Sequence, residues 1–117
     1  MEITSASLRL AALGHETRLA IFRLLVQAGP EGLNPGAICE TVGMPAATLS
    51  FHLAHLAKVG LINGRQEGRF IYYVADYEAM NELLGYLTEN CCEGRPCLPK
   101  TAVVAAPKKL SRARSAR

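Results

Sequence analysis

The spacing of apolar residues near the start of the chain predicts two amphipathic helices. From Ser5 to Gly14, leucines and alanines recur at helical spacing, and Gly14 closes the run. From His15 to Ala28, apolar side chains recur every three or four positions with arginines between them, and Gly29-Pro30 ends the pattern. We therefore expect one helix in each of these segments.

Two further helices are predicted with only two residues between them. Asn34 and Pro35 suit the cap and the first turn of a short helix that ends at Gly43. Pro45 opens the next helix, which stops at Gly60. One buried stripe is expected along this helix, formed by Leu49, Leu53, Leu56 and Val59. Two short helices separated only by Gly43-Met44 make a helix-turn-helix.

Beyond Gly60 the pattern changes from helical spacing to short runs typical of strands. Leu61-Ile62 precedes a polar turn over residues 63–69, and the apolar run FIYYV follows at residues 70–74. We expect a two-stranded hairpin here. Asp76 is placed to cap a last helix that runs to about Cys91. The predicted order, α-α-α-α-β-β-α, is mainly α with a two-stranded β wing, and this is a winged helix-turn-helix.

Length and composition limit the chain to one domain. It has 117 residues, of which 50% are hydrophobic and 20% charged, as in an ordinary globular protein with a single core. No apolar run reaches the roughly 18 residues that span a bilayer, and the N-terminus lacks the pattern of a signal peptide. We expect a cytoplasmic protein.

The net charge of +3 is unevenly distributed. Residues 1–97 hold seven of the thirteen Lys and Arg and all ten Asp and Glu, a net charge of −3, whereas residues 98–117 hold six basic residues and no acid. We expect residues 1–97 to form the folded domain, which carries DNA binding, dimerisation and a thiol site. Residues 98–117 are expected to be a basic, disordered tail. Because the domain is mildly acidic, the chain can bind a polyanion only through a local patch of basic residues or through this tail.

The second helix of a helix-turn-helix reads base edges in the major groove. Here its outer face offers small, hydroxyl and imidazole side chains, and the hairpin turn offers arginines that can reach the minor groove or phosphates. The candidate DNA-binding residues are Thr48, Ser50, His52, His55, Lys58, Arg65 and Arg69. Taken singly, each also suits a solvated surface charge or a structural histidine, so the prediction rests on their combination.

Three segments of the sequence carry a resemblance to a known family. The runs LAALGHETRLAIFRLL, ATLSFHLAHLAKVGLI and GRQEGRFIYYV resemble the ArsR/SmtB family of winged-helix metalloregulators over nearly the whole of residues 5–92. The resemblance implies a homodimeric repressor of its own resistance operon that leaves DNA when a toxic metal binds. It also implies recognition-helix roles for Thr48, Ser50 and His52, and wing contacts for Arg65 and Arg69. The helix start Pro45-Ala46-Ala47 is less polar than the family's pattern.

Three of the four cysteines cluster as Cys91, Cys92 and Cys97. Adjacent residues on an intact helix diverge by about 100°, so Cys91 and Cys92 converge on one ion only where the helix frays. Gly94 and Pro96 supply a turn that brings Cys97 back. Three soft thiolates are the donor set expected for As(III) or Sb(III). Zn²⁺ requires a fourth donor, and no His lies near this segment of the sequence. We therefore predict an arsenite or antimonite site as the inducer site, and no catalytic cofactor.

Alternatives to this site remain open. The same thiols suit a redox switch or a divalent-metal sensor, although the His and Asp ligands that other family members carry on the last helix are missing. A small thiol reductase is a weaker alternative because no Cys-x₂-Cys stands beside a βαβ pattern, and we expect no enzyme. Cys39 has no nearby partner in the sequence and is interpreted as a small core residue.

Apolar residues in excess of what one small core needs predict a homodimer formed by the first and last helices. The residues expected at this interface are Leu8, Met80, Leu83, Leu84 and Leu87. The expected partners are thus a second copy of the chain and a palindromic operator of double-stranded DNA, without a membrane.

Overall fold

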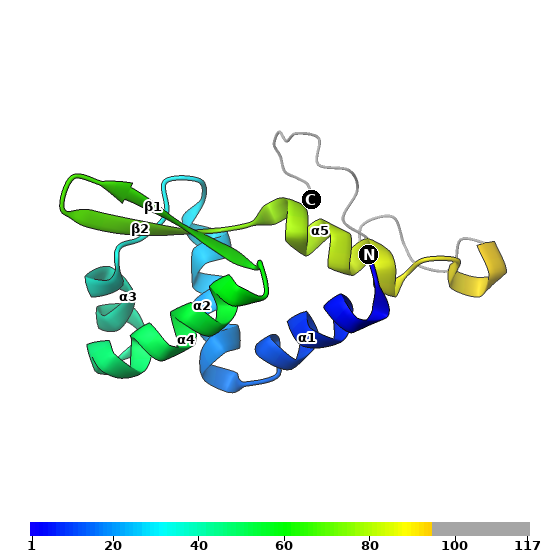
Figure 1. Cartoon of the computed structure of the whole chain (residues 1–117), viewed down its shortest axis with the longest axis horizontal. Coiled ribbons are helices and arrows are strands. Elements are labelled where there is room, and N and C mark those ends of the chain that lie inside the picture. Colours follow the sequence, from blue (N-terminus) through cyan, green and yellow to red (C-terminus); the bar gives the residue numbers. More distant parts are fainter. Residues whose placement is uncertain (95–117) are drawn as a thin grey trace.

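The computed structural model describes residues 1–94 as five helices and one hairpin (Figure 1). The elements are α1 (Ile3–Leu13), α2 (Glu16–Ala28), α3 (Pro35–Val42), α4 (Ala46–Lys58), β1 (Ile62–Glu67), β2 (Phe70–Ala75), α5 (Tyr77–Leu87) and a short 3-10 turn, η1 (Cys91–Gly94). The predicted order of elements is therefore confirmed. The tail expected over residues 98–117 lies outside the described residues. None of the helices in the described part has the length and hydropathy that a bilayer-spanning segment needs.

The helix boundaries follow the capping residues that the sequence predicts. Asn34 Oδ1 accepts a hydrogen bond of 2.9 Å from the backbone N–H of Ala37 at the start of α3, and Gly43 ends α3 with φ of 70°. Asp76 Oδ1 accepts one of 3.0 Å from the N–H of Ala79 at the start of α5. Each cap satisfies a backbone donor that the first turn of a helix leaves unpaired.

The core lies where α2 meets α3, α4 and the base of the hairpin. The largest fully buried side chains are Ile21, Leu25, Ile38, Leu49, Leu56, Leu61 and Ile62. The stripe predicted on α4 is confirmed, because Leu49, Leu53 and Leu56 are all buried and Val59 packs against them at the helix end. Burial of this stripe leaves the opposite face of α4 outward.

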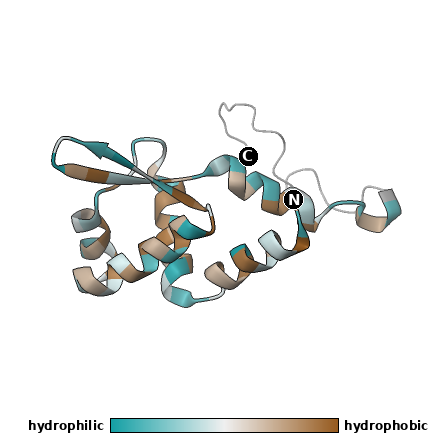
Figure 2. Cartoon of the chain, in the orientation of Figure 1, coloured by the Kyte–Doolittle hydropathy of each residue, from teal (hydrophilic) through white to brown (hydrophobic). Residues whose placement is uncertain are grey.

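The hairpin is longer than predicted, and its turn is shorter. β1 and β2 are antiparallel with Ile62 opposite Ala75 and Glu67 opposite Phe70, so only Gly68-Arg69 forms the turn, with φ of 65° at Gly68. The prediction of a polar turn over residues 63–69 is wrong. Only Ile62 of β1 is buried, and the strand is mostly hydrophilic (Figure 2). It therefore lacks the alternation of apolar and polar residues by which a strand is predicted from sequence.

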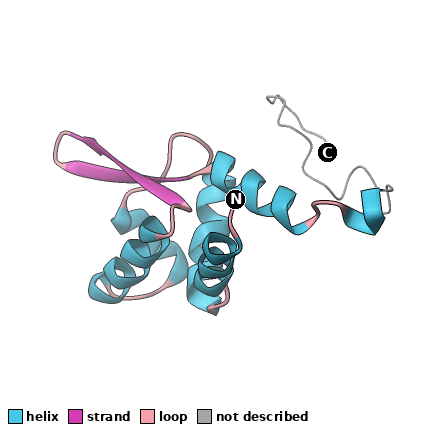
Figure 3. Ribbon diagram, turned by 45° about the vertical axis from the view of Figure 1, so that its right-hand side comes forward, coloured by secondary structure: helices cyan, strands magenta, loops and turns pink. Residues whose placement is uncertain are grey.

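The segment between α2 and α3 is tied to the hairpin at Leu33. The backbones of Leu33 and Tyr73 exchange hydrogen bonds of 3.0 and 2.8 Å. This adds one isolated bridge to the two-stranded sheet, which Figure 3 shows in magenta. Gly32 allows this approach, because a Cβ there would lie 2.5 Å from the carbonyl oxygen of Tyr73. The hairpin base is therefore held in place from α2, while its tip projects.

The last helix ends earlier than predicted. α5 stops at Leu87 with Thr88 as its C-cap, and Asn90 follows with φ of 57°. The prediction of a helix to about Cys91 is wrong by about one turn. Thr88 Oγ1 donates to the carbonyl oxygen of Leu84 at 3.0 Å, a local bond that competes with continuation of the helix.

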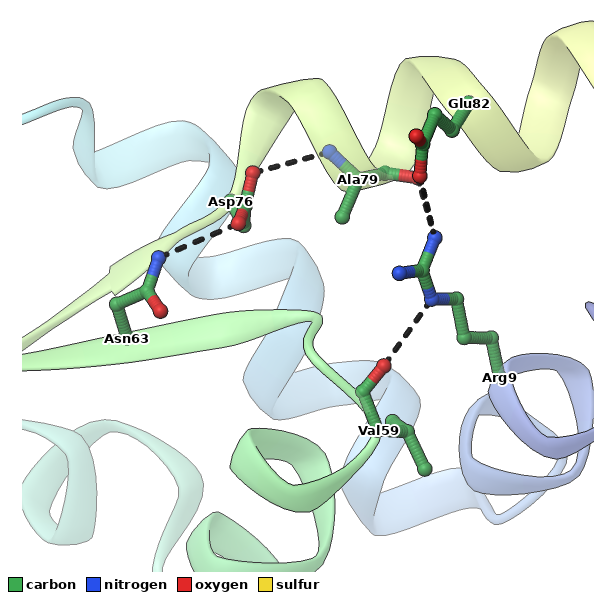
Figure 4. A network of polar contacts seen from close by, with 6 residues as sticks. All are labelled: Arg9, Val59, Asn63, Asp76, Ala79 and Glu82. Carbon is green, nitrogen blue, oxygen red and sulfur yellow. Dashed lines mark hydrogen bonds and ion pairs between the residues drawn. The ribbon is translucent and has the colours of Figure 1, made fainter. Parts of the chain in front are cut away.

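Arg9 of α1 joins the ends of two other helices (Figure 4). Its Nε donates to the carbonyl oxygen of Val59, the C-cap of α4, at 3.0 Å. Its Nη1 donates to the carbonyl oxygen of Ala79 in α5 at 3.3 Å and pairs with Glu82 Oε1 at 3.2 Å. A guanidinium is planar and carries five N–H donors, so one side chain serves three acceptors.

A second polar contact fixes α4 against the start of α2. His52 is 7% exposed, and its Nδ1 lies 3.5 Å from Nη1 of Arg18. Arg18 in turn donates from Nε to the carbonyl oxygen of Ala12 at 2.7 Å, and the His15 ring lies 4.9 Å from the His52 ring. Burial lowers the pKa of His52, and the charges of His15, Arg18 and His55 lower it further. The fold therefore disfavours the charged imidazole here.

We expect Arg9→Met to lower the free energy of unfolding by about 2 kcal/mol, because the methionine keeps the apolar stem and leaves the carbonyl oxygen at the end of α4 and one in the first turn of α5 without the charged donor. Urea denaturation followed by circular dichroism measures the change. Glu82→Gln is the matched control. Its side chain is 58% exposed, so its loss should cost less than about 1 kcal/mol. Equal effects of the two variants would contradict the role of Arg9.

We expect stability to fall as the pH drops below about 6.5, the ordinary pKa of histidine. The folded chain has a lowered pKa at His52, so the unfolded chain binds the proton more readily, and protonation favours unfolding. Urea midpoints at about pH 7.5 and about pH 5.5 test this. His52→Gln keeps an acceptor for Arg18 and loses the titrating ring, so its midpoint should change less between the two pH values. An unchanged pH dependence in this variant would contradict the prediction.

Candidate nucleic-acid interface and thiol segment

The outer face of α4 lies opposite the buried stripe and is made of small and basic side chains. Its exposed residues are Ala46, Ala47, Thr48, Ser50, Phe51, Ala54, Ala57 and Lys58, and His55 is half-buried. No acid occurs anywhere in α4. A helix face without negative charge and with hydroxyl donors near its start can approach phosphates and base edges closely.

The structure separates the predicted recognition-helix residues into two groups. Thr48, Ser50 and Lys58 are on the exposed face of α4, and His55 is beside it. His52 is not, because its ring is buried against Arg18 and His15. The expectation that His52 contacts DNA directly does not fit this burial. A polar residue next to a buried stripe cannot be placed from spacing alone when its partner, Arg18, lies 34 positions away.

The two predicted wing arginines differ in the contacts that they make within the chain. Arg65 pairs with Glu67 at 2.7 Å, donates to the carbonyl oxygens of Pro30 and Glu31 at 3.3 and 3.0 Å, and lies 5.7 Å from the Tyr72 ring centre. Arg69 lies exposed in the two-residue turn. The tip arginine is thus the one presented to a ligand, while Arg65 also holds the hairpin against the segment after α2.

The exposed aromatic ring of Phe51 was missed as a candidate site residue. It lies in the middle of the outer face of α4 and is 66% exposed. The helical spacing places it on that face, but only the polar side chains of the face were predicted to bind DNA. An exposed ring of this size on a binding face is a signal in its own right.

The backbone after α5 brings two adjacent cysteines together. Cys91 Sγ lies 3.7 Å from Cys92 Sγ, and the left-handed conformations of Asn90, Cys92 and Glu93, with φ of 57°, 53° and 58°, replace the helical geometry in which neighbouring side chains diverge. Two thiolates bound to one tetrahedral ion at about 2.3 Å lie about 3.8 Å apart. The pair therefore has the separation of two sulfur ligands on a single ion.

The oxidation state and the third ligand complete the description of the thiols. Cys92 is disulfide-bonded in this structure, whereas Cys91 and Cys39 are free. Within residues 1–94 no three His, Cys, Asp or Glu side chains gather into a metal site, and Cys97 lies outside the described residues. Cys39 packs against the core from α3, which confirms its interpretation as a core residue.

Comparison with known proteins places this geometry in a family. Residues 13–65 match a family model described as a helix-turn-helix domain. The chain is 30% identical over 99 residues to the nodulation protein NolR of Rhizobium meliloti, covering 80% of this chain and 79% of NolR. It is 31% identical over 87 residues to the HTH-type transcriptional regulator YgaV of Escherichia coli, covering 74% and 86%. YgaV is a transcriptional regulator of the helix-turn-helix type.

Solved structures agree with the sequence matches. Reduced HlyU from Vibrio cholerae superposes with a TM-score of 0.58 at 33% identity over 72% of this chain and 88% of HlyU. A homodimeric winged helix-turn-helix DNA-binding domain from Mycobacterium bovis gives 0.62 at 25% identity over 83% and 90%. A possible transcriptional regulator for arsenical resistance gives 0.60 at 25% identity over 68% and 79%. The chain belongs to the ArsR family of winged helix-turn-helix transcriptional regulators.

Proposed function

We propose that this chain is a homodimeric, cytoplasmic repressor of an arsenic-resistance operon, released from its operator when As(III) or Sb(III) binds Cys91, Cys92 and Cys97. The observation that carries the proposal is the 3.7 Å between the sulfurs of Cys91 and Cys92. This separation is close to that of two thiolates on one thiophilic ion, which they can bind once Cys92 is reduced. The similarity to a possible regulator for arsenical resistance supports the same ligand class.

The choice of a metalloid follows from the donor set. Sulfur is the softest donor that proteins offer and favours soft ions over Mg²⁺ or Ca²⁺. As(III) and Sb(III) complete their coordination with three thiolates and keep a lone pair, whereas a structural Zn²⁺ site needs four donors. Cys91 and Cys92 supply two thiolates once Cys92 is reduced, and Cys97, five positions further along, supplies the third.

The operator is bound through two elements in this proposal. α4 enters the major groove with Thr48 and Ser50 toward base edges, and with His55 and Lys58 toward phosphates. Arg69 at the hairpin tip reaches a flanking groove, and Arg65 stands behind it. Two copies related by a dyad then bind half-sites about 34–36 Å apart.

An open apolar cleft supports the dimer. It has a volume of about 410 Å³ and lies between α1, α2 and α5, where it is lined mainly by Leu13, Leu19, Phe22, Met80, Leu83 and Leu84. Leu8 and Leu87 add exposed apolar surface on α1 and α5. Leu83, expected at the interface, is already buried within one copy. The homodimeric relative from Mycobacterium bovis supports the same assembly.

A redox switch is the second candidate, and the disulfide at Cys92 favours it. Oxidation of two thiols to a disulfide can change the turn after α5 without any ion. The similar HlyU structure is described as the reduced protein. The two candidates differ in what triggers release from DNA: a thiophilic ion under reducing conditions, or an oxidant without an ion.

For the operator contacts, we expect Arg69→Ala to weaken binding to all sequences and to reduce the salt slope of log K by about two for a dimer, one phosphate contact in each subunit. Ser50→Ala should keep the slope and reduce the preference for operator over random DNA, because it removes a group that faces base edges. Fluorescence anisotropy at several salt concentrations, on a duplex selected from random DNA, measures both quantities. Unchanged binding in both variants would overturn the operator contacts.

For induction, we expect arsenite to release the reduced wild-type protein from its operator, and Cys91→Ser, Cys92→Ser and Cys97→Ser each to bind operator normally without release. A hydroxyl cannot replace the soft donor. The ligand acts by binding the released conformation more tightly than the bound one, by a factor of about 5–150 in typical coupled systems. Anisotropy during an arsenite titration, with a phosphine as the reductant, measures the release.

Cys39→Ser is the matched control for induction, because this thiol packs against the core, away from the cluster. Arsenite should release this variant from the operator as it releases the wild type. Release by an oxidant but not by arsenite would replace the proposed function with the redox candidate. Normal arsenite release in Cys97→Ser would remove the three-thiolate site.

A further inference from the structure

Phe51 is the largest apolar side chain on the outer face of α4. It is 66% exposed, although burial of such a ring normally contributes about 1.5–3 kcal/mol to a fold. None of the residues that line the apolar cleft between α1, α2 and α5 belongs to α4, so a second copy seated on the cleft need not cover Phe51. The ring is thus presented to something other than this chain's own core or dimer partner.

The neighbours of Phe51 leave its ring standing above the helix surface. Two exposed alanines flank Phe51 on the same face: Ala47, four positions before it, and Ala54, three positions after it. Their side chains are single methyl groups, which are too short to cover the ring. The only ring contact of Phe51 in the described chain is with His52, at 5.5 Å between ring centres and 69° between ring planes. His52 is buried and lies near Arg18, so this edge contact leaves most of the Phe51 ring exposed.

The major groove of DNA offers one apolar feature, the C5-methyl group of thymine. We propose that Phe51 determines specificity by packing on one thymine methyl in each half-site. Cytosine at the same place has no methyl and presents an amino donor, which a phenyl ring cannot accept. Ser50 and Thr48, beside Phe51, contact polar groups of neighbouring bases or phosphates. This assignment rests on the proposed binding of α4 in the major groove.

The test combines two changes: removal of the thymine methyl group from the DNA and removal of the Phe51 ring from the protein. Each thymine of a selected operator is replaced in turn by deoxyuridine, which keeps the base pair and the O4 acceptor and lacks only the methyl. We expect one symmetric pair of positions at which the wild type loses about fourfold in affinity per half-site, the worth of one buried methyl. Phe51→Ala should bind thymine and uracil operators there with equal affinity.

Phe70→Ala is the matched protein control, because it removes an exposed phenyl ring, 54% exposed, from the hairpin and not from the outer face of α4. It should keep the wild-type preference for thymine over uracil. On the DNA side, 5-methylcytosine should bind the wild type about fourfold better than cytosine at the same position, and Phe51→Ala should not distinguish them. Circular dichroism checks that Phe51→Ala is folded, and Phe51→Leu, which keeps an apolar group, should retain part of the preference.

Two outcomes overturn the proposal while leaving the repressor function intact. One is a wild type that binds every uracil operator as well as the thymine operator, although Ser50→Ala still alters sequence preference. The other is a uracil penalty that persists unchanged in Phe51→Ala, which places the methyl contact on another residue. If Ser50→Ala, Arg69→Ala and Phe51→Ala all bind like the wild type, α4 does not contact DNA, and the proposed operator contacts fail together with this one.

Discussion

The guanidinium of Arg9 is the contact on which the relative positions of the helices depend. From α1 it reaches the carbonyl oxygen that closes α4 and a carbonyl oxygen within α5, and its ion pair with Glu82 is on the same helix. The carbonyl oxygen of Val59 closes α4 and has no intrahelical donor, so Arg9 satisfies it while also bonding the first turn of α5. Any shift of α5 along its axis strains or breaks bonds that also hold the end of α4.

This junction lies between the two functional parts of the chain. The outer face of α4 is on one side of it, and the cysteine pair follows the C-terminal end of α5 on the other. Asn63 of β1 also donates to Asp76 at the start of α5, at 3.3 Å, so the hairpin is connected to the same helix (Figure 4). We infer that a ligand at the thiols acts on DNA binding by shifting α5, because the cap of α5 bonds to β1 and Arg9 links α5 to the end of α4.

The sequence predicts most of the fold because its boundaries are set by local chemistry. Asn34, Gly43 and Asp76 act through bonds to residues within four positions, and a pattern read along the chain detects such bonds. β1 and the end of α5 were predicted less well. A projecting strand with one buried residue carries no alternation, and the left-handed backbone at Asn90 and Cys92 leaves no mark in the composition.

The candidate site was predictable only where exposure follows from helical spacing. Thr48, Ser50 and Lys58 lie on the face that the stripe of Leu49, Leu53 and Leu56 leaves outward. His52 lies at the edge of that stripe, and its burial depends on Arg18 and His15, which come from another helix and its cap. The separation of the Cys91 and Cys92 sulfurs likewise required the backbone angles, because a helical backbone would have directed them apart.

The buried His52 connects the outer face of α4 to the start of α2. The ring of Phe51 contacts the edge of His52, and His52 is held near Arg18, which is itself fixed to the end of α1 through the carbonyl oxygen of Ala12. A chain of contacts therefore runs from the α1–α2 corner to the most exposed ring on the DNA-facing surface. An aromatic side chain has only two side-chain torsions to order, so it loses less conformational entropy on binding than a long flexible one, and an exposed phenyl ring on this face suits discrimination between bases.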